Sequence, residues 1–243
     1  MKTFGLIGKN IDYSFSRTYF NQKFSSEKIE AIYKNFDLAH ITEFPVLLNE
    51  NNDISGFNVT IPYKEAIIPY LDELDSTAKE IGAVNTIKIK ENEKLIGYNT
   101  DYFGFTEALK PYLKAHHKKA LILGTGGASK AISYALQKLE IEFTYVSRTK
   151  SFGNFTYSEL TSDIMESHNL IINTTPLGTS PNIEQNPPIP TQFLTSKHLV
   201  FDLIYNPSHT KLMKLALDQN AKVTNGLAML EFQAEKAWEI WNQ

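Results

Sequence analysis

The feature that most constrains the fold is a glycine-rich stretch in the middle of the chain, residues 120–131. An apolar run too short for a helix ends there in three glycines, at positions 124, 126 and 127. Apolar residues then recur at helical spacing, at positions 131, 132, 135, 136 and 139. This order predicts a strand, a tight turn and a helix. Such a turn can hold a phosphate, because the new helix presents free N–H groups at its positive end.

The individual glycines suit a dinucleotide turn for different reasons. Gly124 lets the backbone reverse sharply, and Gly126 lacks the Cβ that would keep a pyrophosphate at a distance. The third glycine of the dinucleotide fingerprint is expected at position 129, where this chain has Ser129. The motif alone therefore leaves a purely structural turn open as an alternative.

The next predicted strand, residues 143–147, indicates which dinucleotide would bind. It follows at the spacing of a βαβ unit, where an acidic residue about 20 positions on would hold the ribose 2′-hydroxyl of NAD. Here the strand ends in Ser147, Arg148 and Thr149, with no acid. A guanidinium and two hydroxyls suit a 2′-phosphate, so the sequence favours NADP(H) over NAD(H). The alternative for Arg148 is a solvated surface arginine.

Composition narrows the class of protein. The 243 residues suffice for one large or two modest domains with a sizeable core. The net charge of −3 gives no reason to expect nucleic acid or an anionic membrane as a partner. The absence of cysteine excludes disulfides, thiolate nucleophiles and Cys-ligated metal. With no signal peptide or long apolar span in sight, we expect a soluble, cytoplasmic protein without a metal site.

In the first hundred residues, strand-like runs alternate with helical patterns. Strands are predicted at residues 3–8, 29–38 and 56–61, and helices at residues 17–25, 41–48, 64–71 and 76–81. Residues 83–90 and 94–98 read as a hairpin, and a helix is predicted from Tyr102 to about His116. This alternation implies an α/β domain whose sheet is mixed, because a hairpin is antiparallel. On the strand at 56–61, Phe57, Val59 and Ile61 are expected to point inward.

The second half repeats the alternation with cleaner strands. They are predicted at residues 120–123, 143–147, 170–173, 199–204 and 222–224, with a further helix at 208–220. The pattern is that of a doubly wound parallel sheet. Residues 179–190 read as one long loop, and residues 227–241 as a helix with an apolar stripe. We expect this last helix to pack back on the first domain.

Polar residues cluster at the ends of the elements predicted in the first half. Ser14 and Ser16 can hold a carboxylate or polyol together, or one of them simply caps the next helix. Lys64 follows a strand, where it can donate a proton or hold a carbonyl by its charge. The alternative is a solvated surface lysine. Asp101 is explained by helix capping alone when taken by itself. As a set, Ser14, Ser16, Thr60, Lys64, Asn85, Asn99 and Asp101 are typical of a site for a small, polyhydroxylated anion.

The second half adds polar segments at strand carboxyl ends, where a cofactor would run. They are residues 173–178 and residues 202–207. On the last helix, Gln233 borders the apolar stripe, where it can face a cleft or remain half-exposed at the surface.

The ordered set of motifs resembles the shikimate dehydrogenase family from the first strand to the last helix. The motifs in the first half are residues 5–8 with Ser14 and Ser16, residues 58–64, residues 82–86 and residues 97–101. Those in the second half are residues 124–128, 147–149, 173–176, 202–207, 225–226, 229–230 and 233–234. The resemblance implies a reversible NADPH-dependent reduction of 3-dehydroshikimate to shikimate, on the route to aromatic amino acids.

The resemblance also implies a role for each matched position. Lys64 and Asp101 would form the catalytic pair, and Ser14 and Ser16 would bind the substrate carboxylate. The remaining substrate contacts implied are Thr60, Asn85, Asp101, Tyr205 and Gln233. The cofactor contacts implied are Gly124, Gly126, Gly127, Ala128, Ser147, Arg148, Thr149, Thr174, Ile204 and Gly226. The NADP(H) pyrophosphate would lie at 126–128, the 2′-phosphate at 148–149 and the nicotinamide near Gly226.

The same resemblance implies two domains. Residues 1–101 plus 225–243 would form an N-terminal mixed-sheet α/β substrate domain, and residues 102–224 a Rossmann-like NADP-binding domain. The chain departs from the family pattern at Tyr13, where histidine is usual, and at Arg17, where proline is usual. It also has Ser147 for a frequent asparagine and Tyr63 for a common phenylalanine.

Two alternatives remain beside this interpretation. One is a quinate/shikimate dehydrogenase of the same superfamily that uses NAD, which an acid near position 148 would have supported. The other is a non-catalytic NADP-binding regulator on the same fold, which loss of Lys64 or Asp101 would have supported. The sequence leaves monomer and homodimer equally open.

Overall fold

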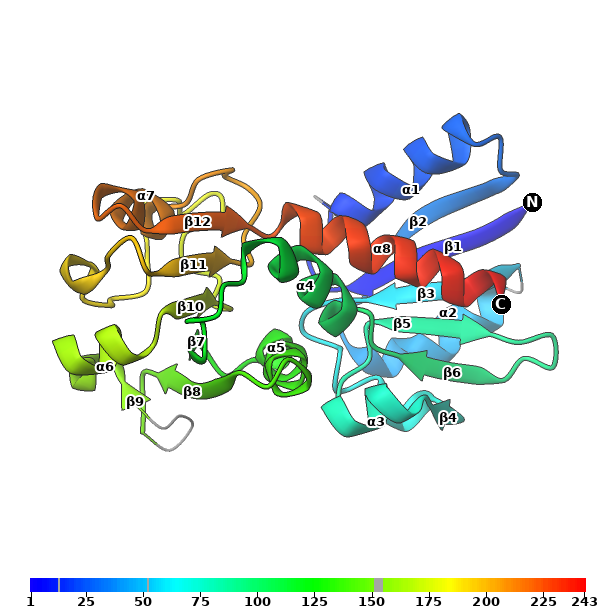
Figure 1. The fold of residues 1–243 in the computed structure, drawn as a ribbon. Coiled ribbons are helices and arrows are strands. Elements are labelled where there is room, and N and C mark those ends of the chain that lie inside the picture. The colour runs from blue at the N-terminus through cyan, green and yellow to red at the C-terminus, as the bar shows by residue number, and fades with distance from the viewer. Residues whose placement is uncertain (13, 52, 151–154) are drawn as a thin grey trace. The chain divides into compact units, whose positions relative to one another are not determined.

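The computed structural model of the chain describes residues 1–12, 14–51, 53–150 and 155–243. The chain divides into two compact units (Figure 1). Unit 1 comprises Met1–Thr100 and Gln233–Gln243, and unit 2 comprises Asp101–Phe232. Each unit contains one six-stranded sheet. No helix in these described ranges is long and apolar enough to cross a membrane.

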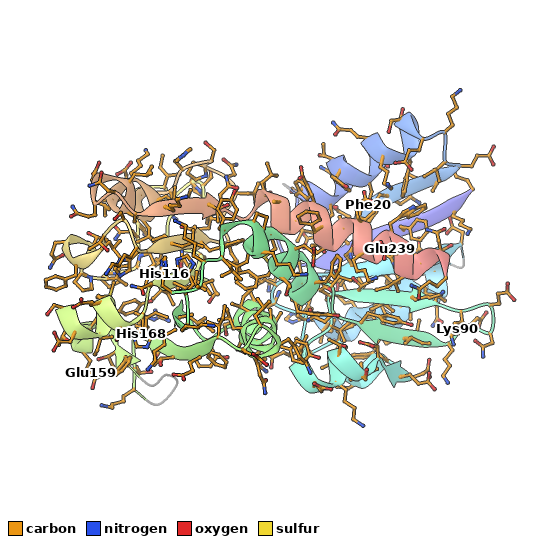
Figure 2. All side chains as sticks on the ribbon, in the orientation of Figure 1. Phe20, Lys90, His116, Glu159, His168 and Glu239 are labelled. Carbon is orange, nitrogen blue, oxygen red and sulfur yellow. The ribbon has the colours of Figure 1, made fainter. Side chains whose placement is uncertain are left out.

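The sheet of unit 1 is mixed, as the sequence predicts. Its strand order is β2-β1-β3-β5-β6-β4. The strands are β1 (Lys2–Gly8), β2 (Ala31–Asp37), β3 (Ile54–Val59), β4 (Glu73–Leu74), β5 (Thr86–Ile89) and β6 (Leu95–Tyr98). β1 runs parallel to both β2 and β3, whereas β5 is antiparallel to β3 and forms the predicted hairpin with β6. Figure 2 labels Lys90 at the turn of this hairpin.

Helices cover both faces of the unit 1 sheet. They are α1 (Phe15–Ser26), α2 (Phe44–Glu50), α3 (Ser76–Ile81) and the second part of α8 (Leu227–Asn242), with the 3-10 turns η1 (Ile41–Glu43) and η2 (Ile68–Tyr70). One face holds an aromatic cluster in which Phe4, Phe20 and Trp241 come from β1, α1 and α8. The Trp241 indole donates to the Ile87 carbonyl at 3.0 Å. Residues 233–243 therefore pack on the first hundred residues.

The sheet of unit 2 is wholly parallel and doubly wound, as predicted. Its strand order is β12-β11-β10-β7-β8-β9. The strands are β7 (Lys119–Leu123), β8 (Glu142–Ser147), β9 (Phe155–Thr156), β10 (Leu170–Asn173), β11 (Leu199–Asp202) and β12 (Lys222–Asn225). The chain builds outward from β7 to β9, then returns to the middle at β10 and builds the other way. The order of strands therefore reverses between β7 and β10, where such sheets bind ligands.

Helices also cover both faces of the unit 2 sheet. They are α4 (Asp101–Leu109), α5 (Gly127–Lys138), α6 (Ser162–Ser167), α7 (Lys211–Asp218) and the start of α8, with η3 (Lys110–Tyr112), η4 (Tyr157–Glu159) and η5 (Thr191–Phe193). Buried side chains of α4, α5 and α8 pack on one face, and those of α6 and α7 on the other. The architecture is the layered α/β arrangement that the alternation of elements predicts.

Three local predictions are wrong. The predicted helix at residues 64–71 is instead a series of turns that ends in η2, which contains Pro69. The helix predicted to reach His116 ends at Leu109, and Pro111 lies in the 3-10 turn that follows. Proline lacks the N–H for a helical bond, and its ring clashes with a carbonyl one turn back. Ile61 is 70% exposed rather than inward, because β3 ends at Val59.

Candidate active site

The register of the unit 1 sheet brings several polar segments to one edge. β1 and β3 are parallel, so their carboxyl ends lie at the same edge. Asn58 pairs with Thr86 and Thr86 pairs with Tyr98, so β5 begins and β6 ends there too. The residues next to these strand ends, Thr60, Asn85 and Thr100, therefore come together from distant parts of the sequence.

Asn85 lies at the centre of a buried cluster of amides and hydroxyls. Its Nδ2 donates to Thr100 Oγ1 at 3.0 Å and to Gln233 Oε1 at 3.4 Å. Its Oδ1 accepts from the Thr100 backbone N–H at 2.7 Å. The Thr86 hydroxyl donates to the same oxygen at 3.1 Å. Gln233 is thus buried within unit 1 rather than half-exposed, with 6% of its surface accessible.

Lys64 is fixed beside this cluster by its backbone. The Lys64 carbonyl accepts from the Val84 N–H at 2.7 Å, one residue before Asn85. Thr60 is also held at the edge, since its N–H donates to the Ile7 carbonyl at 2.8 Å. The Lys64 side chain is half-buried. A cation on the rim of a cluster of hydrogen-bonding groups is suited to a carbonyl or a carboxylate.

Asp101 follows Thr100 along the chain and is the first residue of α4. It is buried, with 6% of its surface accessible. The helix therefore begins at Asp101, one residue earlier than predicted. A carboxylate in the first turn interacts favourably with the positive end of the helix.

The two serines after β1 lie in different surroundings. Ser14 is the N-cap of α1, and its hydroxyl accepts from the Arg17 N–H at 3.2 Å. Ser14 therefore caps the helix, which is the alternative to carboxylate binding that the sequence left open. Ser16 is half-buried and forms a side-chain hydrogen bond with Tyr33. The Arg17 guanidinium donates to the Asp12 carbonyl at 2.9 Å, and Tyr13 lies outside the described residues.

The glycine turn of unit 2 has the geometry of an anion cradle. Gly124 has φ +103°, which L side chains rarely adopt, and Gly126 is the N-cap of α5. An added Cβ at Gly126 would meet no atom of the described chain within 4 Å, so space is open in front of the helix. Gly127 and Ala128 form the first turn of α5. The N–H groups at such a helix start bind phosphate.

Ser129 occupies the position where the fingerprint has its third glycine. Its side chain is buried, and its hydroxyl donates to the Gly126 carbonyl at 2.7 Å. Its backbone N–H donates to the same carbonyl at 2.9 Å. Both donors of Ser129 thus bind the Gly126 carbonyl, so a serine is compatible with this turn.

Thr174 lies where the strand order reverses. Its hydroxyl and its N–H donate to the Leu123 carbonyl at 2.7 Å and 3.0 Å. Gly124 N–H in turn donates to the Val146 carbonyl at 2.9 Å. The turn is thus fixed to β8 on one side and to β10 on the other, so the backbone before α5 is held in place.

The end of β8 presents the residues predicted to select the cofactor. Arg148 and Thr149 are exposed, and the Ser147 hydroxyl donates to the Thr149 carbonyl. Burial raises the pKa of Tyr157, and the charge of Arg148 opposes this rise. The nearby acid Glu159, labelled in Figure 2, accepts from Lys150 and from the Thr156 N–H, which lowers its pKa to about 2.

The polar residues at the ends of β10 and β11 mainly bind one another. Asn173 Nδ2 donates to Asp202 Oδ1 at 3.0 Å, and the Thr210 hydroxyl donates to Asp202 Oδ2 at 2.7 Å. Burial raises the pKa of Asp202, an effect that these hydrogen bonds oppose. The Ile204 N–H also donates to Asp202. These hydrogen bonds join the ends of β10 and β11 to each other and to the start of α7.

Two further predicted residues, Tyr205 and Gly226, adjoin Ile204, whose N–H donates to Asp202. Tyr205 is half-buried, which raises its pKa. Gly226 N–H donates to the Ile204 carbonyl at 3.2 Å, and an added Cβ would lie 2.0 Å from the Leu203 carbonyl oxygen. Only glycine fits at this position.

Sequence reasoning missed four members of the unit 1 cluster as site residues. They are Tyr33, Asn58, Thr86 and Thr100. Three of them flank or lie inside motifs already recognised, which is the signal that could have found them. Tyr33 has no such signal, because a tyrosine in an apolar strand reads as core.

The fold and the glycine turn together define a dinucleotide-binding α/β protein of two units. A family profile for the shikimate dehydrogenase substrate binding domain matches residues 6–87. In an alignment of 252 positions, the chain is 40% identical to the shikimate dehydrogenase (NADP(+)) of Clostridium botulinum, covering 99% of this chain and 96% of that one. The chain belongs to the shikimate dehydrogenase family.

Solved structures agree with this membership. A crystal structure of shikimate dehydrogenase in complex with NADP+ superposes with a TM-score of 0.86 at 37% identity, covering 99% of this chain and 90% of the other. The Thermus thermophilus shikimate 5-dehydrogenase in complex with NADP(H) and shikimate gives 0.88 at 29% identity, covering 99% and 93%.

Proposed function

We propose that this chain is an NADP-dependent shikimate dehydrogenase, an oxidoreductase that reduces 3-dehydroshikimate reversibly to shikimate in aromatic amino acid biosynthesis. The observation that carries the proposal is the cluster of Asn85, Thr100 and Gln233 at the edge where Lys64 lies. Amides and hydroxyls that both donate and accept suit a substrate with several hydroxyls. A lysine beside them suits its carbonyl.

The substrate contacts follow from this cluster and from the family. Ser14 and Ser16 bind the carboxylate in this proposal, and Tyr205 provides a further contact. Thr60, Asn85, Asp101 and Gln233 contact the hydroxyls and the reacting carbon. The hydrogen bonds around Asn85 and Gln233 support these roles, since they hold the amides in fixed orientations.

The residues of unit 2 fit NADP(H). The open space in front of Gly126 and the N–H groups of Gly127 and Ala128 suit the pyrophosphate. Ser147, Arg148 and Thr149 suit the 2′-phosphate, and the exposure of the latter two supports this. The remaining contacts proposed are Gly124, Thr174, Ile204 and Gly226.

Lys64 and Asp101 form the catalytic pair in this proposal. The bound cofactor supplies the hydride that the C3 carbonyl of the substrate receives. Lys64, as an ammonium, stabilises the negative charge that grows on the carbonyl oxygen and delivers the proton that completes the alcohol. Asp101 orients the lysine and accepts a hydrogen bond from a neighbouring substrate hydroxyl.

We assign substrate binding to residues 1–101 plus 225–243 and cofactor binding to residues 102–224. The division of the chain into Met1–Thr100 with Gln233–Gln243 and Asp101–Phe232 supports this assignment. A cytoplasmic location is part of the proposal, and so is a monomer or homodimer as the working form.

The test is the absorbance of the reduced nicotinamide when the protein is mixed with shikimate and NADP at pH 9. We expect a steady rise with shikimate and NADP, and slower rates when quinate replaces shikimate or NAD replaces NADP. No rise with any pair of substrates contradicts the proposal. A faster rate with quinate and NAD favours the quinate/shikimate dehydrogenase alternative.

A further inference from the structure

Tyr33 of β2 is held rigidly inside unit 1. Its side chain is buried, and its ring stacks on Phe20 of α1 with centroids 4.7 Å apart and planes at 12°. The Asn21 side chain pairs with its backbone: Nδ2 donates to the Tyr33 carbonyl at 2.9 Å, and the Tyr33 N–H donates to Oδ1 at 3.0 Å. The hydroxyl of Tyr33 therefore has little freedom to move.

This hydroxyl donates to Asn58 Oδ1 at 2.7 Å. Burial raises the pKa of Tyr33 well above its ordinary value, and the hydrogen bond with Ser16 opposes this rise. The hydroxyl therefore keeps its proton at neutral pH and remains a donor.

The other end of the Asn58 amide faces the Asn85 segment. Asn58 Nδ2 donates to the Asn85 carbonyl and to Thr86 Oγ1, both at 3.2 Å. A backbone carbonyl only accepts, so Nδ2 must face it and Oδ1 must face Tyr33. The Thr86 hydroxyl, having accepted from Asn58, donates onward to Asn85 Oδ1. The hydrogen bonds thus run in one direction from Tyr33 to the Asn85 amide.

We infer that Tyr33 is a positioning residue for the reaction, whose hydroxyl acts through Asn58 to fix the Asn85 amide for the substrate hydroxyls. The inference rests on the proposed function, in which Asn85 contacts those hydroxyls. Without the Tyr33 hydroxyl, Asn58 Oδ1 is a buried acceptor with its donor removed, which is costly. Oδ1 can reach another donor only if the Asn58 amide rotates, and rotation withdraws Nδ2 from Asn85 and Thr86.

The first experiment compares Tyr33→Phe with Thr3→Val. Thr3 is a matched control, because it lies in the same unit, is 1% exposed and donates its hydroxyl to Asp53 near the start of β1. For Tyr33→Phe we expect KM for shikimate to rise about tenfold, with KM for NADP within about twofold of the parent. Thr3→Val should change neither constant. A KM for shikimate that is unchanged in Tyr33→Phe, or raised equally in Thr3→Val, overturns the inference.

The second experiment asks whether Tyr33 acts through Asn85. In an Asn85→Ala background, Tyr33→Phe should produce no further rise in KM for shikimate, because the group that it positions is gone. A full additional rise in that background overturns the inference, since the hydroxyl would then act by another route.

A third readout separates this inference from the proposed function. In protein labelled with ¹⁵N-asparagine, the side-chain amide signals of Asn85 should shift in Tyr33→Phe and stay in place in Thr3→Val. Unmoved Asn85 signals in Tyr33→Phe overturn the positioning role whatever the activity. A parent protein that oxidises no shikimate contradicts the proposed function instead, and shifted Asn85 signals in the variant still support the coupling of Tyr33 to Asn85.

Discussion

Gly126 offers a sharp test of the cofactor site, because an added methyl group meets open space instead of protein. Its φ of −79° and ψ of −179° are extended values that any residue adopts, and its Cβ position has no described atom within 4 Å. In Gly126→Ala, the lower entropy of the unfolded chain raises stability by about 0.4–1 kcal/mol. The weaker N-cap offsets this by a similar amount. We therefore expect the free energy of unfolding to stay within about 1 kcal/mol of the parent.

Binding of NADP should respond very differently. The new methyl group occupies the space from which a pyrophosphate reaches the N–H groups at the start of α5. Loss of one charge-assisted hydrogen bond costs about 1.5–3 kcal/mol, which corresponds to a rise in the Kd for NADP of roughly 10- to 100-fold. KM for shikimate should be unaffected, because Gly126 is not among the residues proposed to contact the substrate.

Gly82→Ala is the control. Gly82 is the C-cap of α3 in unit 1 and has φ +70°, so alanine there is strained. This variant should lose about 1–2 kcal/mol of stability and keep its affinity for NADP. The assays are denaturant unfolding and calorimetric titration with NADP. If Gly126→Ala binds NADP as tightly as the parent, the pyrophosphate does not lie against this turn and our reasoning about the site is wrong.

Three further outcomes are expected. Lys64→Met should lower kcat by roughly 100-fold or more while KM for shikimate changes far less, and near-normal turnover would remove Lys64 from the chemistry. Arg148→Ala should weaken NADP about tenfold or more and leave NAD nearly unchanged in steady-state kinetics, because only NADP has the 2′-phosphate; equal losses would contradict its role. Burial and the neighbouring His116 charge lower the pKa of His117, whose Nδ1 accepts from the Lys114 N–H at 3.0 Å. The imidazole of His117 therefore binds a proton more tightly in the unfolded chain than in the folded protein, so the Tm should fall as pH drops below about 6.5. His117→Asn should reduce that fall in Tm, and a pH profile identical to that of the parent would refute the assignment.

The elements that the sequence predicts well are those whose pattern is both long and local. The strand, glycine turn and helix at 120–138 form a periodic unit, and they fold as β7 and α5. The strands β4 and β9 escape prediction because each has two residues, which is too short to show a period of two. The helix predicted at 64–71 does not form for another reason. Its apolar residues have helical spacing, but Pro69 lacks the N–H that a helix needs at that position, and its ring clashes with a carbonyl one turn back.

The site residues show the same difference between local patterns, which are predictable, and long-range contacts, which are not. Motif order placed Thr60, Lys64 and Asn85 near one another, because each follows or precedes a strand end. The bonds that orient them were out of reach, since Asn85 meets a glutamine 148 residues away and Asn58 meets a tyrosine 25 residues away. Such partners depend on sheet register and helix packing, which local patterns do not encode. The role of Ser14 as an N-cap was predictable from its position alone.

The split of unit 1 between the two ends of the sequence has a consequence for synthesis. Trp241 stacks on Phe4 with ring centroids 4.7 Å apart and lies 5.3 Å from Phe20, yet these partners emerge from the ribosome long before it does. Unit 2 is one uninterrupted segment, so all of its strands are available before the last helix is translated. The half of the protein that is made first is therefore the half that finishes folding last, and its aromatic face needs protection until then.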